Sequence, residues 1–403
     1  MSRPATDAKP LAGLGGASAP GAGFVRLSLP REPRAAEWTG EQAAVLDPAR
    51  AAVARDTLRA WDGYAPTPLV ALQALAAALG VERVWCKDES GRFGIGSFKA
   101  LGGAYAVLRV LQDEVERRTG RRPAAGELLA REVDAVREVT AVTASAGNHG
   151  RSVAWGSERL GCRAVVFLPR DAAPARAEAI RSHGAEVIRF EGPYDEAVEH
   201  ADREAAARGW LVVSDTAYAG YEAVPRHVSE GYTLLADELL GQLEERGEGP
   251  LTHLFIQTGV GGLATGVCGH LWAALGAARP RFVAVEPLSA DCFGRSLRAG
   301  RRVSVPGPFD TGMGGLASGV PSTVAWTLLG RCLDGAVALH DELVDVAARA
   351  LAGGALGASI DAGPSGVAGV AVLLGLARLP GAARLCGLGA GSRVAALVTE
   401  RRF

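Results

Sequence analysis

Short apolar runs alternate with longer helical patterns from about Phe24 onward, and this alternation constrains the fold more than any other feature. It is typical of βαβ units, in which crossover helices join parallel strands. Strands are predicted at 83–87, 139–143, 164–168, 186–190, 211–214, 253–257 and 282–286. Helices are predicted between them, for example at 150–160, 173–183, 194–208 and 263–276. We therefore expect an α/β fold of mostly parallel, open sheets with flanking helices.

The length of 403 residues suits two domains rather than one. The alternation restarts after the loop-rich segment DTAYAGYEAVP, so a change of domain is expected near 212–223. A charged stretch at 112–138 contains Gly120, Pro123 and Gly126. It is interpreted as a helix, an exposed connection and a second helix.

Charge and composition exclude several classes of partner. The net charge of -1 argues against nucleic acid or an anionic membrane as the main partner, because both require a clustered positive field. The six cysteines form no CxxC pair, and the seven histidines are dispersed. This distribution favours reduced thiols in a cytoplasmic protein and predicts no metal site.

The N-terminal segment superficially resembles a signal peptide. Its uncharged run from Leu11 to Val25 contains five glycines and Pro20, which makes it too polar and too flexible for a hydrophobic signal core. We expect a disordered tail over 1–23. The most apolar later segment, at 367–376, is far shorter than the roughly 20 residues of a membrane span. A soluble, cytoplasmic protein is expected.

The first chemical signal is the segment KDESGRFGIGSFK, which ends at Lys99. Its three glycines make a permissive loop, and the small-residue run ALGGAY that follows Lys99 is typical of a helix start. A partly desolvated lysine has a lowered pKa, and its neutral amine can form a Schiff base. Taken alone, the pattern fits a surface lysine in a glycine-rich turn equally well.

The second signal is SAGNHG, at 145–150, between a predicted strand and a predicted helix. Such a loop presents backbone N–H groups and the positive end of a helix dipole to an anion. Asn148 adds an amide that can donate and accept hydrogen bonds. The alternative is an ordinary turn in which Asn148 serves as the N-cap.

The third signal is QTGVGGL, at 257–263, again between a strand and a helix. Its glycines allow backbone N–H groups to approach a phosphate closely. Gly259, Gly261 and Ala264 also match the dinucleotide pattern GxGxx(G/A), and Glu286 ends a later strand. A dinucleotide site of this kind leaves the Lys99 and Asn148 loops unexplained.

The three signals together meet the requirements of pyridoxal phosphate. They supply a lysine for its aldehyde, a loop for a carboxylate and a glycine loop for its phosphate. The chain resembles the fold-type II pyridoxal-phosphate enzymes, and among them the 2,3-diaminopropionate ammonia-lyases. The resemblance rests on motifs spread over most of the chain beyond the tail: YAPTPL, KDESGRFG, FK-LGGAY, GNHGRSVAW, DTAYAGY, QTGVGGLATG, VEPLSADC and MGGLA.

The resemblance implies a two-domain fold like that of the tryptophan synthase beta-subunit. The large, cofactor-binding domain would comprise 24–99 and 216–403, and the small, substrate-side domain would comprise 100–215. A homodimer is implied as well.

The resemblance also implies roles for individual residues. Lys99 would form the Schiff base with the cofactor, and Asp215 would transfer a proton at the substrate. Thr399 would contact the pyridine nitrogen. Asn148 would bind the ring hydroxyl, and the loop of Ser145, Ala146, Gly147, Asn148 and His149 would hold the substrate carboxylate. The phosphate loop would comprise Gly259, Val260, Gly261, Gly262 and Leu263.

Three positions depart from the family pattern. Ala146 replaces an aspartate linked to the handling of one substrate enantiomer, which makes the loop similar to that of serine and threonine dehydratases. Pro364 replaces the glutamate of Ser-Gly-Glu-Ser-Gly. The C-terminal Ser-Thr-Glu-Gly reads Val398-Thr399-Glu400-Arg401, and the sequence ends two residues later.

The leading hypothesis is elimination of ammonia from 2,3-diaminopropionate, in its L form, to give pyruvate and ammonia. The alternative within the same chemistry is a serine/threonine dehydratase-like enzyme or a β-replacement enzyme of a biosynthetic pathway. Two further alternatives are a nicotinamide oxidoreductase built on the Gly259 loop and a catalytically inactive relative that binds the cofactor.

Overall fold

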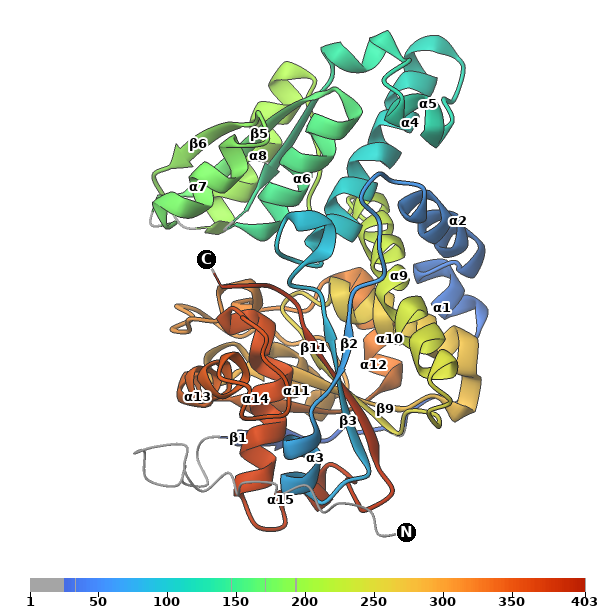
Figure 1. Ribbon diagram of the computed structural model, residues 1–403. Coiled ribbons are helices and arrows are strands. Elements are labelled where there is room, and N and C mark those ends of the chain that lie inside the picture. The colour runs from blue at the N-terminus through green and yellow to red at the C-terminus, as the bar shows by residue number, and fades with distance from the viewer. Residues whose placement is uncertain (1–24, 33, 146, 171, 193, 403) are drawn as a thin grey trace.

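The computed structural model describes residues 25–402 except 33, 146, 171 and 193. The tail predicted at 1–23, and Ala146 of the predicted substrate loop, lie outside the described residues. The described chain forms a seven-stranded sheet and a four-stranded sheet, each covered by helices (Figure 1). The α/β architecture expected from the sequence is confirmed.

The seven-stranded sheet has the order β1-β10-β9-β8-β11-β3-β2. Its inner pairs are parallel, and the two edge strands, β1 and β2, pair antiparallel. Its strands are β1 (Val25–Ser28), β2 (Leu69–Ala71), β3 (Arg83–Asp88), β8 (His253–Gln257), β9 (Arg281–Pro287), β10 (Leu333–Leu339) and β11 (Arg393–Val398).

The four-stranded sheet is entirely parallel, in the order β6-β5-β4-β7. Its strands are β4 (Thr140–Ala144), β5 (Arg163–Pro169), β6 (Glu186–Phe190) and β7 (Leu211–Val212). Helices α6 (Asn148–Leu160) and α7 (Pro174–Arg181) pack on one face, and α8 (Tyr194–Arg208) packs on the other. All four strands fall within 100–215, the span that we propose for the small domain.

The seven-stranded sheet is also covered on both faces, and the two layers form separate apolar cores. The core on one face includes residues of α9 (Ala223–Glu245), α10 (Gly262–Leu275) and α12 (Thr323–Cys332). The core on the opposite face includes residues of α3 (Gln73–Leu79), α13 (Asp341–Ala352) and α14 (Pro364–Arg378). The remaining helices are α1 (Gly40–Val45), α2 (Pro48–Arg59), α4 (Tyr105–Thr119), α5 (Ala125–Leu129), α11 (Cys292–Ala299) and α15 (Ala382–Leu385).

Most predicted elements lie within a few residues of those observed, and β6, β8 and α8 have the predicted bounds. The charged stretch at 112–138 contains the end of α4, a connection, α5 and a short 3-10 helix (Asp134–Glu138). Four strands were not predicted: β1, β2, β10 and β11. β1 and β2 are short edge strands, whereas β10 and β11 are alanine- and valine-rich runs whose periodicity does not distinguish a strand from a buried helix.

The segments singled out by sequence all follow the carboxyl ends of parallel strands. The Lys99 loop follows β3, the 145–150 loop follows β4, the glycine loop follows β8, and Thr399 follows β11. Asp215 comes shortly after β7. In open α/β sheets, ligands bind at this edge. Among the described helices, none is long and apolar enough to cross a membrane.

Candidate active site

Lys99 and Asp215 form the centre of the site. The Lys99 ammonium donates a hydrogen bond to the Asp215 carboxylate, although the two residues are 116 positions apart. Burial by itself raises the pKa of Asp215, but attraction to the Lys99 ammonium outweighs it and holds that pKa well below its usual range. The side chains are 20% and 14% exposed, so a ligand can still reach the pair.

A single π-helical turn (Ala100–Ala104) separates Lys99 from α4. Such turns are uncommon and are frequent at functional sites. The turn packs closely on α9, because a Cβ at Gly102 would lie only 2.5 Å from the Tyr232 ring. Lys99 therefore immediately precedes a closely packed element.

His149 places its ring beside this ion pair, a role that the sequence did not predict. Its Nε2 lies 2.8 Å from the carbonyl oxygen of Val213, and a carbonyl only accepts, so Nε2 carries the proton. Nδ1 lies 3.7 Å from the Asp215 carboxylate and has no hydrogen-bond partner among the described residues. Burial lowers the pKa of His149 more than Asp215 raises it. The neutral ring thus presents a lone pair to the site.

Tyr232, on α9, provides a second buried polar atom without a partner. The side chain is 1% exposed, and its ring packs on Phe98 with 4.8 Å between the centroids. The hydroxyl makes no hydrogen bond to any described residue. Burial raises its pKa, with Lys99 and Asp215 as the charges that also act on it. Nδ1 of His149 and this hydroxyl both lie near the Lys99–Asp215 pair, where they could bind a polar ligand.

The glycine loop between β8 and α10 has the properties of an anion site. Within the described part of the chain, the backbone amides from Val260 to Ala264 donate no hydrogen bond. These amides stand at the N-terminus of a 14-residue helix, where the helix dipole also favours an anion. A Cβ on Gly262 would lie 3.9 Å from the Asp215 carbonyl oxygen, which places the loop beside the catalytic candidates.

The 145–150 loop is organised by a hydroxyl rather than by an asparagine cap. Ser145 Oγ accepts the amides of Gly147 and Gly150 at 3.0 and 2.9 Å. Asn148 starts α6, and its side-chain amide donates to Glu400 instead of capping the helix. The backbone amides of Asn148 and His149 donate no hydrogen bond to any described residue, so they are available for a carboxylate.

The C-terminal residues complete the site from the other sheet. The Thr399 carbonyl accepts the Phe98 amide at 3.0 Å, next to Lys99, and the Thr399 amide donates to Gly366 at 3.3 Å. Glu400, immediately after Thr399, reaches Asn148 on the opposite side. Glu400 was not among the predicted site residues, although its position beside Thr399 could have indicated it.

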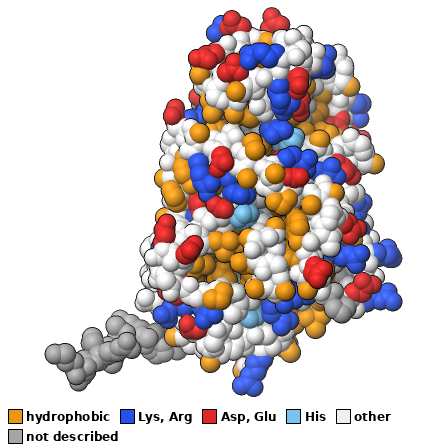
Figure 2. All heavy atoms as spheres, turned by 90° about the vertical axis from the view of Figure 1, so that its right-hand side faces the viewer, with side chains coloured by type: hydrophobic (Ala, Val, Ile, Leu, Met, Phe, Trp, Pro, Cys, Tyr) orange, Lys and Arg blue, Asp and Glu red, His pale blue; other side chains and the backbone are white. Residues whose placement is uncertain are grey.

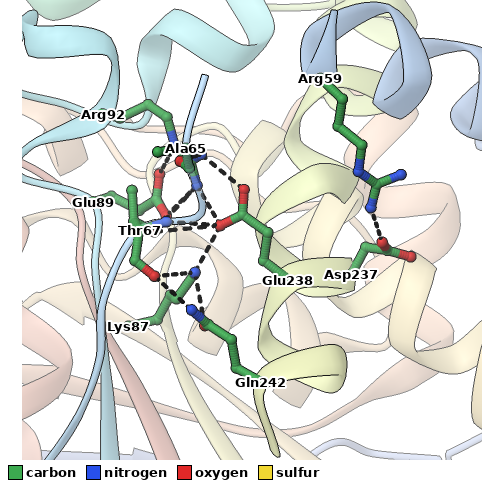
Figure 3. Close-up of polar contacts among 9 residues, drawn as sticks. All are labelled: Arg59, Ala65, Thr67, Lys87, Glu89, Arg92, Asp237, Glu238 and Gln242. Atoms are coloured by element: carbon green, nitrogen blue, oxygen red, sulfur yellow. Dashed lines mark hydrogen bonds and ion pairs between the residues drawn. The ribbon is translucent and has the colours of Figure 1, made fainter. Parts of the chain in front are cut away.

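A buried polar network fixes the loop that leads to Lys99 (Figure 3). Glu238, on α9, accepts hydrogen bonds from Lys87 at 2.7 Å and from Arg92 at 2.7 and 2.8 Å. Arg92 also pairs with Glu89 at 2.8 Å, and Lys87 donates to the carbonyl oxygen of Thr67. The network ties β3 and the glycine-rich loop to the helix that follows the Asp215 segment.

The family of pyridoxal-phosphate-dependent enzymes matches this chain over residues 60–400. The chain belongs to this family. The diaminopropionate ammonia-lyase of Escherichia coli strain K12 is 38% identical over 344 residues, which cover 83% of each chain. A crystal structure of the Escherichia coli enzyme in complex with D-serine superposes with a TM-score of 0.84, at 33% identity and with 94% of each chain covered. Another, in complex with an aminoacrylate-PLP azomethine reaction intermediate, has a TM-score of 0.82.

The site fits the cofactor of this pyridoxal-phosphate-dependent enzyme. It offers a lysine for an aldehyde, backbone amides that no described residue accepts for a phosphate, and, near the lysine, two polar atoms without a described partner. It does not fit a dinucleotide. Glu286, which would have bound a ribose, accepts the amides of Phe293 and Gly294 at 2.7 and 2.8 Å and is fully buried. The nicotinamide alternative therefore lacks the carboxylate that would bind the ribose.

Proposed function

We propose that the protein eliminates ammonia from the L form of 2,3-diaminopropionate, giving pyruvate and ammonia. The observation that carries this proposal is the Lys99–Asp215 ion pair, which lies close to both the glycine loop and the 145–150 loop. The similarity to the diaminopropionate ammonia-lyases supports the choice of substrate.

We assign the cofactor contacts as follows. Lys99 Nζ binds the aldehyde, Asn148 the ring hydroxyl and Thr399 the ring nitrogen. The phosphate lies on the amides of the glycine loop: Gly259, Val260, Gly261, Gly262 and Leu263. When bound, pyridoxal phosphate withdraws electrons from the α-carbon of an amino acid attached to it, which acidifies the α-proton.

Asp215 and Lys99 are placed to move protons. In the free protein, the Lys99 charge keeps Asp215 ionised against the effect of burial. When Lys99 no longer faces it as an ammonium, burial dominates and raises the proton affinity of the carboxylate. Asp215 can then accept a proton and deliver it to a departing amine, while Lys99 Nζ serves as the second proton carrier.

The loop of Ser145, Ala146, Gly147, Asn148 and His149 is assigned to the substrate carboxylate. The proposal of the L enantiomer rests on Ala146, where the family has an aspartate linked to one enantiomer. Ala146→Asp is expected to broaden the enantiomer tolerance. Unchanged selectivity in this variant would contradict the assignment.

Pyruvate release from a panel of amino acids tests the function. L-2,3-diaminopropionate should be the best substrate, with the D form slower, and Lys99→Ala should be inactive. Absence of pyruvate from both enantiomers would exclude the proposal. A serine/threonine dehydratase-like or β-replacement activity is the second candidate, favoured by the sequence Ser145-Ala146-Gly147-Asn148. Pyruvate from serine, or 2-ketobutyrate from threonine, at a higher rate would establish it.

We further propose that the protein acts as a homodimer in the cytoplasm. All six cysteines are free, which suits a reducing compartment. Hydrophobic side chains are visible over the lower half of the face shown in Figure 2. Exposed apolar patches commonly mark interfaces. Light scattering of the purified protein tests this state.

A further inference from the structure

Glu400 is a buried carboxylate that bridges the two sheets across the site. Its residue is 8% exposed and lies just beyond β11 of the large sheet, whereas Asn148 begins α6 beside the small sheet. The amide nitrogen of Asn148 donates directly to the Glu400 carboxylate. Figure 1 shows that the chain after β11 runs between the part that contains the seven-stranded sheet and the part that contains the four-stranded sheet.

The backbone of Glu400 is held from two sides. An antiparallel bridge pairs it with Ser97, and the next residue, Arg401, donates its amide to Gly96 at 3.0 Å. On the other side, the Gly363 amide donates to the Glu400 carbonyl oxygen at 3.0 Å. The position of Glu400 is therefore coupled to the loop that carries Lys99.

The surroundings provide space and charge for this side chain. A Cβ at Gly363 would lie 2.9 Å from a Glu400 carboxylate oxygen, so a larger residue there would displace it. Burial raises the pKa of Glu400, while the Arg176 charge and hydrogen bonds from Asn148 and Ser365 counteract this effect. Ser365 Oγ accepts the Gly315 amide at 3.0 Å, which leaves its proton for Glu400.

The hydrogen bond determines how the Asn148 amide is turned. When Glu400 is ionised, its carboxylate only accepts, so the NH₂ group, and not the carbonyl oxygen, faces it. This group has two N–H bonds, and only one of them is used by Glu400. No described residue accepts the second, so it can serve another acceptor, such as the ring oxygen of the cofactor.

We propose that Glu400 is a positioning residue that fixes the Asn148 amide as a donor to the ring oxygen of pyridoxal phosphate. This inference rests on the proposed role of Asn148. Without Glu400, the amide can flip and present its carbonyl oxygen, which repels an oxygen that carries negative charge. The ring oxygen carries that charge in the form of the bound cofactor that absorbs visible light, so the spectrum reports the effect.

The test uses the full-length holoenzyme without any amino acid, so its outcome is independent of whether diaminopropionate is the substrate. Glu400→Ala and Glu400→Asp remove or shorten the acceptor, whereas Glu400→Gln keeps an acceptor oxygen. Asp345→Asn is the matched control, because Asp345 is an exposed acid that lines the same opening. The ratio of visible to near-ultraviolet absorbance and the Kd for pyridoxal phosphate are measured at several pH values.

Glu400→Ala and Glu400→Asp should lower the absorbance ratio and raise the Kd about fivefold or more, the effect expected of one oriented hydrogen bond. Glu400→Gln should stay within about twofold of the native protein, and Asp345→Asn should not differ from it. If Glu400→Ala does not fold, the Glu400→Asp and Glu400→Gln pair decides the question.

A double-mutant cycle separates positioning from general support of the fold. If Glu400 acts through Asn148, replacing Glu400 in an Asn148→Ala background should change neither the ratio nor the Kd further. An equal effect of Glu400→Asp in both backgrounds, or a native spectrum in Glu400→Asp, would overturn the proposal.

Discussion

At the residue scale, the site depends on two opposite charges, Lys99 and Asp215, that lie in contact in a largely buried environment. Asp215 and Lys99 stabilise each other as ions, and the neutral His149 ring faces both. The balance at Asp215 is set by its neighbours rather than by its own chemistry. Its function should therefore be separable from cofactor binding.

Asp215→Asn tests this separation. The amide keeps the size of the side chain but cannot carry the proton. We expect a near-native cofactor spectrum and a turnover that falls by about 10² or more, as is usual when a positioned acid or base is lost. Steady-state pyruvate formation measures the change, and normal turnover would remove Asp215 from the chemistry.

Tyr232→Phe tests whether the Tyr232 hydroxyl lacks a partner in the cofactor-free protein. Tyr221→Phe is the matched control, because it removes a hydroxyl that is hydrogen-bonded. The Tyr221 hydroxyl accepts the Ser214 amide and donates to the Val212 carbonyl, both at 2.9 Å. Its loss should lower the stability of the cofactor-free protein by about 1–2 kcal/mol. The Tyr232 hydroxyl has no described partner, so its loss should cost less than about 0.5 kcal/mol. Urea midpoints compare the two, and equal losses would contradict a free hydroxyl.

At the element scale, two connections position the site: the loop from β3 to Lys99 and the loop from β8 to α10. Ion pairs inside the protein hold the first against α9, whereas glycines allow the second to turn closely, and no described residue accepts its amides from Val260 to Ala264. Loss of a charge beside the first loop should therefore lower stability, whereas a methyl group added at the open position Gly262 of the second loop should lower ligand affinity.

Glu238→Gln tests the first loop, with Asp237→Asn as its control on the same helix (Figure 3). Loss of the Glu238 charge leaves Lys87 and Arg92 buried without one of their counter-charges, which should cost about 3–5 kcal/mol. Asp237 pairs with Arg59 and His270 near the surface, so its loss should cost less than about 1 kcal/mol. Urea unfolding measures both, and similar losses would refute the distinction.

Gly262→Ala and Gly261→Ala test the second loop. An alanine at Gly262 meets no atom closer than 3.9 Å, so the fold should persist, while the added methyl group occupies ligand space and weakens cofactor binding. Gly261 has a φ of +104°, and a Cβ there would lie 2.6 Å from Ala325, so its replacement should destabilise the protein itself. Thermal unfolding and cofactor titration distinguish the two outcomes.

At the scale of the whole molecule, stability depends on the protons that the folded chain holds. Glu286 is fully buried near the end of β9, and its carboxyl group contacts the first turn of α11. Burial raises its pKa to about 8, although the amides of Phe293 and Gly294 lower it. The folded state therefore binds this proton more tightly than the unfolded state, where the pKa is about 4.3. Its contribution is complete below the unfolded pKa and is lost as the pH rises through about 8.

The free energy of unfolding should thus decrease between about pH 5 and pH 8, by up to about 1.4 kcal/mol per pH unit from this group. Glu286→Gln cannot titrate and should flatten the decrease. Chemical denaturation at several pH values measures both slopes, and identical slopes would show that Glu286 does not hold the proton.

The amino-acid sequence by itself determined the α/β class and the bounds of β6, β8 and α8, and its motifs singled out Lys99, Asn148 and the glycine loop as candidate site residues. These features follow from periodicity and from local motifs, which act over a few residues. They needed no knowledge of which strands are neighbours.

Only the tertiary structure decided which side chains meet. The edge strands, the order of the sheets, the ring of His149, the hydroxyl of Tyr232 and the carboxylate of Glu400 depend on contacts between segments far apart in the chain. Asn148 and Glu400 are 252 positions apart, and their hydrogen bond exists because the two sheets place their carboxyl edges together. Such contacts have no local signal, since each residue type fits many surroundings until the packing is known.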